Sequence, residues 1–447
     1  MKSTRTVLIC GALTLTLAMG VRQTMGLLLP PMTLAHGWTR DEFAFAIALQ
    51  NVLWGAFVPF AGAIADRFGA ARVLIASSLT YVASLVLMAL SATPLALDFS
   101  AGLLMGLALS GTTFGVVMGV VSKLVSAEKR SVALGIVGAG GSFGQFAMVP
   151  YGQALISGIG WFNALLVLAF TAALIVPLAA GLAGKIAERG AHSARQTANE
   201  AFNEAFGQRT FHYLFWSYFV CGVHTAFIAL HLPSYVQDSG MSAAVGMTAL
   251  ALIGFGNIFG SFGAGWLGGR VSKKWLLTWI YALRSIAITL LLIAPKVPAT
   301  LYVFAFCMGL LWLSTVPLTQ GLVAQIFGTG HVSMLAGVVF FGHQIGGFLG
   351  AWVGGLIFTR LGSYDMAWWI SIGLGVFAAI VCAPPTRGRS RGRRRRRHER
   401  GAHTARRVDR ARRVRIRRGL VGDLPQLPHP GHDDVLPYVP LVPVSRG

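Results

Sequence analysis

The sequence predicts an all-α polytopic membrane protein whose twelve transmembrane helices form two pseudo-symmetric halves of six helices each. Of the 447 residues, 55% are hydrophobic and only 12% are charged, which is too apolar for a soluble domain of this length. Apolar segments of about 20 residues or more recur along the chain, and each can cross roughly 30 Å of hydrocarbon as a helix. A loop pattern that occurs twice relates the two halves.

The twelve predicted spans all precede residue 384. The first six are 6–34, 42–64, 72–92, 98–122, 131–156 and 161–184, and the second six are 210–235, 243–268, 274–294, 298–325, 331–358 and 365–383. Lys2 and Arg5 precede the first segment, but its apolar run is too long for a signal peptide and has no small-residue cleavage site. Between the first two spans, Thr39 and Glu42 are spaced as a capping box that opens the second span.

The cysteines predict no bound metal. All four fall inside predicted spans: Cys10, Cys221, Cys307 and Cys382. Neither a disulfide framework nor a metal cluster is therefore indicated, and no cofactor is expected.

Lys and Arg residues set the expected orientation. Fourteen of those before residue 384 fall on one side of the membrane: Lys2, Arg5, Arg67, Arg72, Lys123, Lys129, Arg130, Lys185, Arg189, Arg195, Arg209, Arg270, Lys273 and Lys274. Three fall on the other side: Arg40, Lys296 and Arg360. The positive-inside rule makes the first side cytoplasmic, so we expect both termini in the cytoplasm and the chain in the cell membrane, the inner membrane of a bacterium.

The chain divides into four parts. Residues 1–184 form the first six-helix half, 185–209 a cytoplasmic linker, 210–383 the second half and 384–447 an Arg-rich and Pro-rich tail. The loop GAIADRFGAAR after span 2 aligns with GWLGGRVSKK after span 8 at an offset of 203 residues, which places Gly62 on Gly265 and Arg67 on Arg270. Repeated halves are the usual architecture of a transporter that rocks around a central site.

The loop after span 2 resembles the signature loop of the major facilitator superfamily, through Gly62, Asp66, Arg67, Gly69 and Arg72. The second copy, around Arg270, departs from that pattern because Gly269 stands where an Asp is expected. The resemblance implies that Asp66 and Arg67 are switch residues that lock the cytoplasmic helix ends between conformations. The other interpretation is that they only anchor the loop at the lipid headgroups.

Three stretches are closer to the monocarboxylate and oxalate/formate branch of that superfamily: GVRQTMGLLLPP in span 1, RSVALGIVGAGGSFGQ in span 5 and GFGNIFGSFGAG in span 8. The resemblance implies transport of small organic anions by proton symport or by exchange. The sequence departs from the branch in span 8, where Asn257 and Ser261 stand at positions that many monocarboxylate carriers fill with Asp and Arg.

Ionisable groups inside the predicted spans are all basic: Arg22, His224, His231, Arg284 and His343. The acids before residue 384 all fall in loops or at span ends, and Asp98 lies nearest to a span interior. A buried charge is costly, so intramembrane ionisable groups indicate function. Arg22 remains charged and has no carboxylate at its depth, so a bound anion is expected to compensate it. Alternatively, Arg22 bonds carbonyls freed near Pro30 and Pro31, or reaches the outer headgroups.

The other candidate site residues have two interpretations each. His224 and His343 can carry a coupled proton or can be hydrogen-bonded packing residues, and His231 is expected at the outer mouth. Arg284 either contacts substrate or braces span 9 against a neighbour. Neutral polar groups can complete a site or can link helices. These are Gln23, Gln145, Asn257, Gln320, Gln325 and Gln344.

The tail has 18 Arg, no Lys and 5 acids, a balance of 18 − 5 = +13 out of the chain's +22. Such a run can bind anionic headgroups or nucleic acid nonspecifically, and it is also what a frameshift in GC-rich DNA produces. We assign it no function and expect no specific nucleic-acid partner.

The sequence therefore predicts one function and leaves one alternative. The first is a secondary carrier of small organic anions, expected to be a monomer, and the alternative is an exporter of drugs or other uncharged solutes on the same fold. No GxxxxGK[ST] or HExxH motif is present, so neither an ATP-driven pump nor an intramembrane metalloenzyme is indicated.

Overall fold

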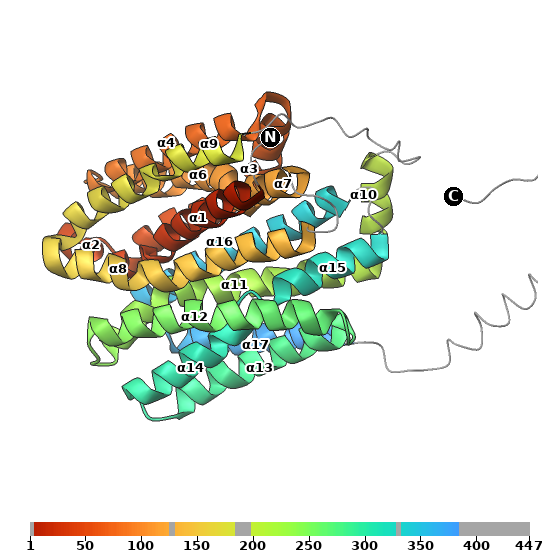
Figure 1. Cartoon of the computed structure of the whole chain (residues 1–447). Coiled ribbons are helices and arrows are strands. Elements are labelled where there is room, and N and C mark those ends of the chain that lie inside the picture. The colour runs from red at the N-terminus through yellow and green to blue at the C-terminus, as the bar shows by residue number, and fades with distance from the viewer. Residues whose placement is uncertain (1–3, 125–129, 184–197, 328–331, 384–447) are drawn as a thin grey trace, which may run out of the picture. The chain divides into compact units, whose positions relative to one another are not determined.

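The computed structural model describes residues 4–124, 130–183, 198–327 and 332–383. The tail and most of the 185–209 linker lie outside these ranges. The described secondary structure is helical (Figure 1). The first half contains α1 (Thr4–Gln23), α2 (Met25–His36), α3 (Arg40–Phe68), α4 (Ala70–Ala89), α5 (Pro94–Leu97), η1 (Asp98–Leu104), α6 (Met105–Thr112), α7 (Phe114–Leu124), α8 (Arg130–Ala173) and α9 (Ile175–Leu182). The second contains α10 (Ala198–Phe206), α11 (Arg209–Asp238), α12 (Ala243–Gly268), α13 (Lys273–Ile293), α14 (Pro298–Leu311), α15 (Thr315–Phe327), α16 (Val332–Leu361) and α17 (Asp365–Cys382).

Eleven helical stretches among the described residues are long and apolar enough to cross a membrane. One of them, Ala133–Leu182, contains predicted spans 5 and 6 and has 50 residues. It reverses at Gly160, whose φ of +79° suits a residue without a Cβ. The hydroxyls of Tyr151 and Thr171, on opposite sides of Gly160, lie 3.0 Å apart. Because this stretch crosses twice, the structure agrees with the predicted twelve spans.

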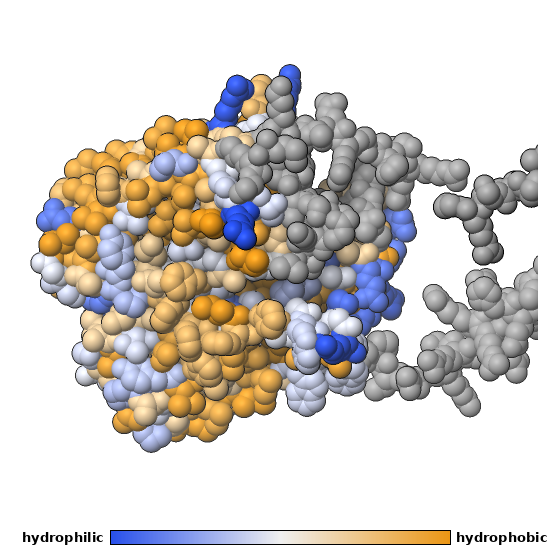
Figure 2. Space-filling view, viewed as in Figure 1, coloured by the Kyte–Doolittle hydropathy of each residue, from blue (hydrophilic) through white to orange (hydrophobic). Residues whose placement is uncertain are grey.

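Apolar side chains cover much of the visible bundle surface, as a lipid-facing surface requires (Figure 2). The predicted capping box is confirmed, because Thr39 and Glu42 bond reciprocally at the start of α3. In Figure 1 most helices of the first half, red to yellow, lie above most of those of the second half, green to blue, while the blue α16 overlaps α1 and α8.

Four predicted spans are not continuous helices, a detail that the sequence prediction did not include, and one of them is span 6, interrupted at Leu174 between α8 and α9. Span 1 is interrupted at Thr24, between α1 and α2, and span 10 at residues 312–314, between α14 and α15. Span 4 begins as the π-helical segment η1 and is interrupted at Thr113, which has an extended backbone. Breaks within a membrane require other groups to satisfy the freed backbone, and discontinuous helices mark transporter binding regions.

The breaks in spans 4 and 10 are supported from equivalent positions in the two halves. Trp54 Nε1 donates to Thr113 Oγ1 at 2.9 Å, and Asn257 Oδ1 accepts from the Leu313 backbone N–H at 3.1 Å. Trp54 and Asn257 are 257 − 54 = 203 residues apart, the same offset that relates the two loops. The internal repeat therefore extends to the side chains that support the broken helices.

Arg284 of α13 also supports the break in span 10. It is fully buried, and its Nε and Nη2 donate to the Leu311 carbonyl at 3.2 and 2.6 Å. Nη2 donates to the Trp312 carbonyl as well. These carbonyls lie at the carboxyl end of α14, where the helix dipole is negative and backbone acceptors lack helical partners. The contacts of Arg284 therefore match the interpretation that it braces span 9 against a neighbouring helix, here the end of α14.

Two ends of the bundle are distinguished by their residues. The far end carries Arg40, Asp238 and Tyr364, and the terminal end carries Thr4 and Cys382. Between the halves, α3 packs on α16, α8 packs on α12, and α2 packs on α11.

Contact between α3 and α16 stops partway along the pair. An added Cβ at Gly355, near the far end, would lie 2.9 Å from the Arg40 carbonyl oxygen, and one at Gly55, in the middle, would lie 2.7 Å from Gln344 Cβ. Gly62 lies on the same face of α3 as Gly55, and Gly337 lies on the same face of α16 as Gln344. Each is two helical turns closer to the terminal end. At both of these glycines, no atom of the described residues lies within 4 Å of an added Cβ. The halves are thus joined at the far end and parted toward the terminal end.

We predict that Arg284→Gln lowers the free energy of unfolding by about 2 kcal/mol or more, because two buried carbonyls lose charge-assisted donors. The measurement is the thermal unfolding midpoint of the purified protein in detergent. Arg360→Gln, at an exposed arginine, is the matched control and should shift stability by less than about 0.5 kcal/mol. An Arg284→Gln protein that melts at the wild-type temperature would contradict the bracing role.

Candidate functional site

A pocket lies between the two halves, among α1, α2, α3 and α11. Its polar lining comes from Arg22, Gln23, Gln50 and Asn51, and its apolar lining includes Ala226, Ala229 and Leu230 of α11. Its empty volume, which includes its open mouth, is about 320 Å³. The pocket is thus small, polar on the side of the first half and apolar on the side of the second.

Arg22 is held at this pocket by two side chains of α3. Its Nη2 donates to Asn51 Oδ1 at 2.5 Å, and its Cζ lies 4.9 Å from the centroid of the Trp54 ring. Arg22 Nε is buried and has no hydrogen-bond partner among the described residues. The guanidinium therefore lies against a polar and aromatic wall while part of its donor set remains available.

The contacts of Arg22 differ from both alternatives that the sequence left open. The expected break near Pro30 and Pro31 is absent, because α2 runs through both prolines, and the Thr33 hydroxyl donates there to the carbonyls of Leu29 and Pro30, at 2.8 and 3.1 Å. Arg22 instead contacts Asn51 and Trp54, within the interface between the halves. Among the described residues the recorded ion pair is Arg40–Asp238, so Arg22 has no carboxylate partner there.

Gln50 and Asn51 were not selected by sequence analysis. Asn51 Nδ2 donates to the Ile47 carbonyl at 2.9 Å, which turns its Oδ1 toward Arg22. Gln50 Nε2 donates to the Ala101 carbonyl of η1 at 3.0 Å. Two adjacent amides inside an apolar span, in ALQNVLWG, are the signal that would have identified them.

Polar groups continue from this pocket into α16. Gly347 packs against the Asn51 side chain, and Gln344, one turn away, packs against Gly55 of α3. His343 Nδ1 lies 3.0 Å from Gln344 Oε1, and its ring centroid lies 4.8 Å from that of Tyr218. The buried Gln344 Nε2 and His343 Nε2 atoms have no partner among the described residues. These polar groups therefore extend from Arg22 toward His343, and among the described residues the two side chains share no hydrogen bond.

The other predicted site residues are engaged away from the pocket. Asn257 Nδ2 donates to Ser142 Oγ and Gln145 Oε1, at 3.1 and 3.0 Å, while its Oδ1 accepts from Ser261 and Leu313. Its amide therefore links α12 to α8 and to the break in span 10, and it has no hydrogen-bonding capacity left for a ligand.

His224 is engaged away from the pocket through one ring nitrogen, while its buried Nδ1 has no partner among the described residues. It is fully buried in α11, and its Nε2 lies 2.8 Å from the Ser371 carbonyl of α17. Arg284 is committed to the break in span 10, as described above. Neither residue lines the pocket that contains Arg22.

The predicted switch-loop residues lie at the terminal end. Gly69 has a φ of +95° and forms the turn from α3 into α4, a conformation that favours glycine. Arg67 and Arg72 are exposed, and the side chain of Asp66 lies outside the described part of the structure. In the second copy, Arg270 Cζ stacks 3.6 Å from the centroid of the Trp266 ring. Gly62 faces open space between the parted helices.

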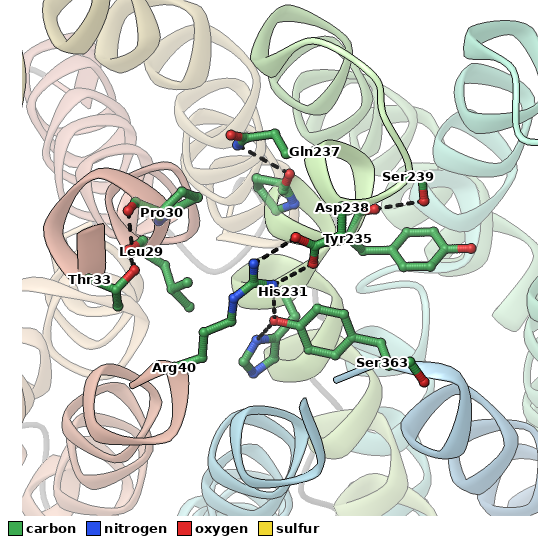
Figure 3. Close-up of polar contacts among 12 residues, drawn as sticks. Leu29, Pro30, Thr33, Arg40, His231, Tyr235, Gln237, Asp238, Ser239 and Ser363 are labelled. Atoms are coloured by element: carbon green, nitrogen blue, oxygen red, sulfur yellow. Dashed lines mark hydrogen bonds and ion pairs between the residues drawn. The ribbon is translucent and has the colours of Figure 1, made fainter. Parts of the chain in front are cut away.

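A polar network that sequence analysis missed joins the halves at the far end (Figure 3). Arg40 at the start of α3 donates to both oxygens of Asp238 at the end of α11, at 2.5 and 2.7 Å. Arg40 Nη1 also donates to the Tyr364 hydroxyl at 3.0 Å. Burial raises the pKa of Tyr364 to about 12, so its hydroxyl stays protonated. This far-end latch, comprising Arg40, Asp238, Tyr364 and His231, connects residues far apart in the chain.

The tautomer of His231 follows from its partners in the latch. Its Nε2 lies 2.7 Å from the Ala351 carbonyl, which can only accept, so Nε2 carries the proton. Nδ1, 3.1 Å from the Tyr364 hydroxyl, then accepts from it. The hydroxyl therefore donates to His231 while it accepts from Arg40, and a single chain of hydrogen bonds spans both halves. The sequence had placed His231 at the outer mouth.

These observations define a membrane protein with two helical halves, a polar pocket between them and a closure at one end, which is the plan of a transporter. The sequence profile of the Major Facilitator Superfamily matches residues 11–264 and 214–424. The chain belongs to this superfamily, as a secondary transporter and not an enzyme.

Relatives with curated names are distant. The chain is 26% identical over 347 residues to the uncharacterized MFS-type transporter YcxA of Bacillus subtilis, covering 75% of this chain and 83% of that protein. It is 26% identical over 366 residues to monocarboxylate transporter 11 of Mus musculus, covering 78% and 80%. It is 24% identical over 313 residues to monocarboxylate transporter 13 of Rattus norvegicus, covering 68% and 71%.

Solved structures agree on the fold. A bacterial homolog of the human lysosomal transporter Spinster, in an inward-facing and unoccupied conformation, superposes with a TM-score of 0.62 at 16% identity, covering 85% of this chain and 95% of that one. The same homolog in its occupied form gives a TM-score of 0.65 at 15% identity, covering 84% and 95%. At this identity the likeness concerns the fold alone.

Proposed function

We propose that this chain carries small organic anions, with monocarboxylates first among them, across the membrane by alternating access. The observation that supports it is a surplus of buried hydrogen-bond donors around a fixed cation that has no carboxylate partner. Arg22 Nε, Gln23 Nε2 and Gln344 Nε2 are buried and unpartnered among the described residues. An anion offers acceptors to such donors and balances the charge, whereas a cation does neither.

The donor geometry favours a carboxylate in particular. Guanidinium N–H groups lie in one plane and match the two oxygens of a carboxylate, and Asn51 and Trp54 already restrict how Arg22 turns. The apolar wall from Ala226 to Leu230 of α11 suits a short hydrocarbon substituent. The names of two relatives, monocarboxylate transporters 11 and 13, fit this proposal.

The same proposal assigns an orientation and a conformational state. Lys and Arg concentrate in the loops at the terminal end, which supports a cytoplasmic location for that end and for both termini, in a cell whose inner membrane holds the chain. Since the halves are joined at the far end and parted at the terminal end, the structure then represents an inward-facing state. The far-end latch is the contact that outward opening has to break.

The proposal also concerns how transport is driven. No carboxylate lines the pocket among the described residues, and His343 is a histidine close to the pocket's polar residues, through its contact with Gln344. Transport then follows either proton symport through His343 or exchange of one anion for another. A pH gradient should drive uptake in the first case and have little effect in the second.

The decisive variant is Arg22→Gln. In proteoliposomes, wild-type protein should take up labelled lactate, pyruvate or oxalate but not an uncharged solute of similar size. Arg22→Gln should reduce anion uptake at least about 100-fold, the effect of losing about 3 kcal/mol of charge-assisted hydrogen bonding. Arg22→Lys should keep part of the uptake, because the charge remains while the planar donors are lost.

Arg209→Gln, at an exposed arginine outside the pocket, is the matched control and should transport like wild type. Unchanged uptake by a correctly inserted Arg22→Gln protein would remove Arg22 from the site. Uptake of the neutral solute in place of the anions would favour the alternative function, export of drugs or other uncharged solutes.

Asp238→Asn should weaken the far-end latch and increase the outward-facing population. Intact cells would be treated with a thiol reagent that cannot cross the membrane, in a background whose native cysteines are replaced by alanine. Ala44→Cys, a buried position in α3 that packs against Gly355, should react several-fold faster when Asp238→Asn is present.

Asp365→Asn is the control for the latch, because among the described residues the Asp365 carboxylate accepts a hydrogen bond from nearby Ser363 and none from the first half. Ser363→Cys should react from outside in every background, whereas Arg67→Cys should react only after lysis. The reverse pattern would overturn the proposed orientation, and equal Ala44→Cys rates with and without Asp238→Asn would overturn the latch.

A further inference from the structure

Gln50 differs from its neighbours in the pocket because its unpartnered atom is an acceptor. Its side chain is fully buried, and Oε1 has no hydrogen-bond partner among the described residues. Arg22 and Gln23, which line the same pocket, have unpartnered donors instead. A simple anion satisfies donors only, so it leaves the Gln50 oxygen unpaired at a cost of about 1–3 kcal/mol.

The orientation of the Gln50 amide follows from its other contact. Nε2 donates to the Ala101 carbonyl at 3.0 Å. Turning the amide over would place two carbonyl oxygens against each other and lose that bond. Ala101 belongs to the π-helical segment η1, Asp98–Leu104, so a local irregularity of span 4 directs the Gln50 oxygen.

Asn51 cannot substitute for Gln50 in this respect. Its Oδ1 accepts from Arg22 and its Nδ2 donates to Ile47. Gln50 therefore offers the pocket a fixed acceptor next to the residue that holds Arg22. A ligand that pairs with both groups must carry an anionic end and a hydrogen-bond donor.

We propose that the pocket selects small hydroxycarboxylates, whose carboxylate pairs with Arg22 while the hydroxyl donates to Gln50 Oε1. This inference rests on the proposed anion transport and names its substrate class. A keto acid presents a carbonyl oxygen to Gln50, and two acceptors repel. An unsubstituted acid leaves Gln50 unpaired. An amino acid adds an ammonium group to a region whose fixed charge is already positive, with no pocket-lining carboxylate to receive it.

The test compares lactate, propionate and pyruvate, which share a three-carbon carboxylate skeleton and carry a hydroxyl, a hydrogen or a keto oxygen at the second carbon. Uptake of each labelled acid into proteoliposomes containing the full chain gives kcat/KM ratios. For wild type we expect lactate to be preferred about tenfold over the other two, the effect of one satisfied hydrogen bond. Gln50→Leu should reduce that preference to less than about twofold, mainly by loss of lactate uptake.

Gln50→Met is a second variant of similar length, in case leucine disturbs folding. Gln153→Leu is the matched control, because the hydrogen bond from Gln153 to Ser157 is exposed. It should keep the wild-type ratio of kcat/KM for lactate to that for the other two acids. Arg22-dependent uptake without a preference for lactate, or with a preference that both Gln50 variants keep, would overturn this inference and leave the proposed function standing. Absence of carboxylate uptake in wild type would overturn both.

Discussion

A permanent positive charge between two apolar half-domains is the constraint on which the proposed mechanism depends. Arg22 cannot be neutralised by a carboxylate, since the ion pair recorded among the described residues lies at the far end, between Arg40 and Asp238. The protein compensates the charge in part with an amide oxygen and an aromatic face. Neither carries a full negative charge, so an anionic ligand gains more at this position than a neutral one does.

The second half contains a fully buried arginine, whereas Arg22 is partly exposed, and that second arginine has a different role. Arg284 bonds carbonyls at the carboxyl end of α14 and makes a discontinuous helix tolerable in lipid. The first half supports its own broken span with Trp54, which also packs on Arg22. Repeated architecture therefore provides two broken helices, and only the first half combines its break with a cation that faces the pocket.

Much of the fold follows from sequence because segment length, hydropathy and the repeated loop are local properties, and the spans, the reversal at Gly160 and the capping box agree with them. The breaks at Thr113 and near Trp312 do not follow, because they depend on donors from other helices. Arg22, which the sequence predicts to bind substrate, lines the pocket, whereas Gln50 and Asn51 were missed because neutral amides hardly alter hydropathy. Asn257 and Arg284 were grouped with Arg22 by chemistry, and packing separates them.

The central claim, that the pocket binds an anion through Arg22, is tested most directly by titrating purified protein with lactate and with lactamide. These two molecules have nearly the same shape and both carry the hydroxyl, but only lactate is charged. The account predicts calorimetric binding of lactate that disappears in Arg22→Gln, and no detectable binding of lactamide to the wild-type protein. Equal binding of both molecules, or lactate binding that survives in Arg22→Gln, would contradict it.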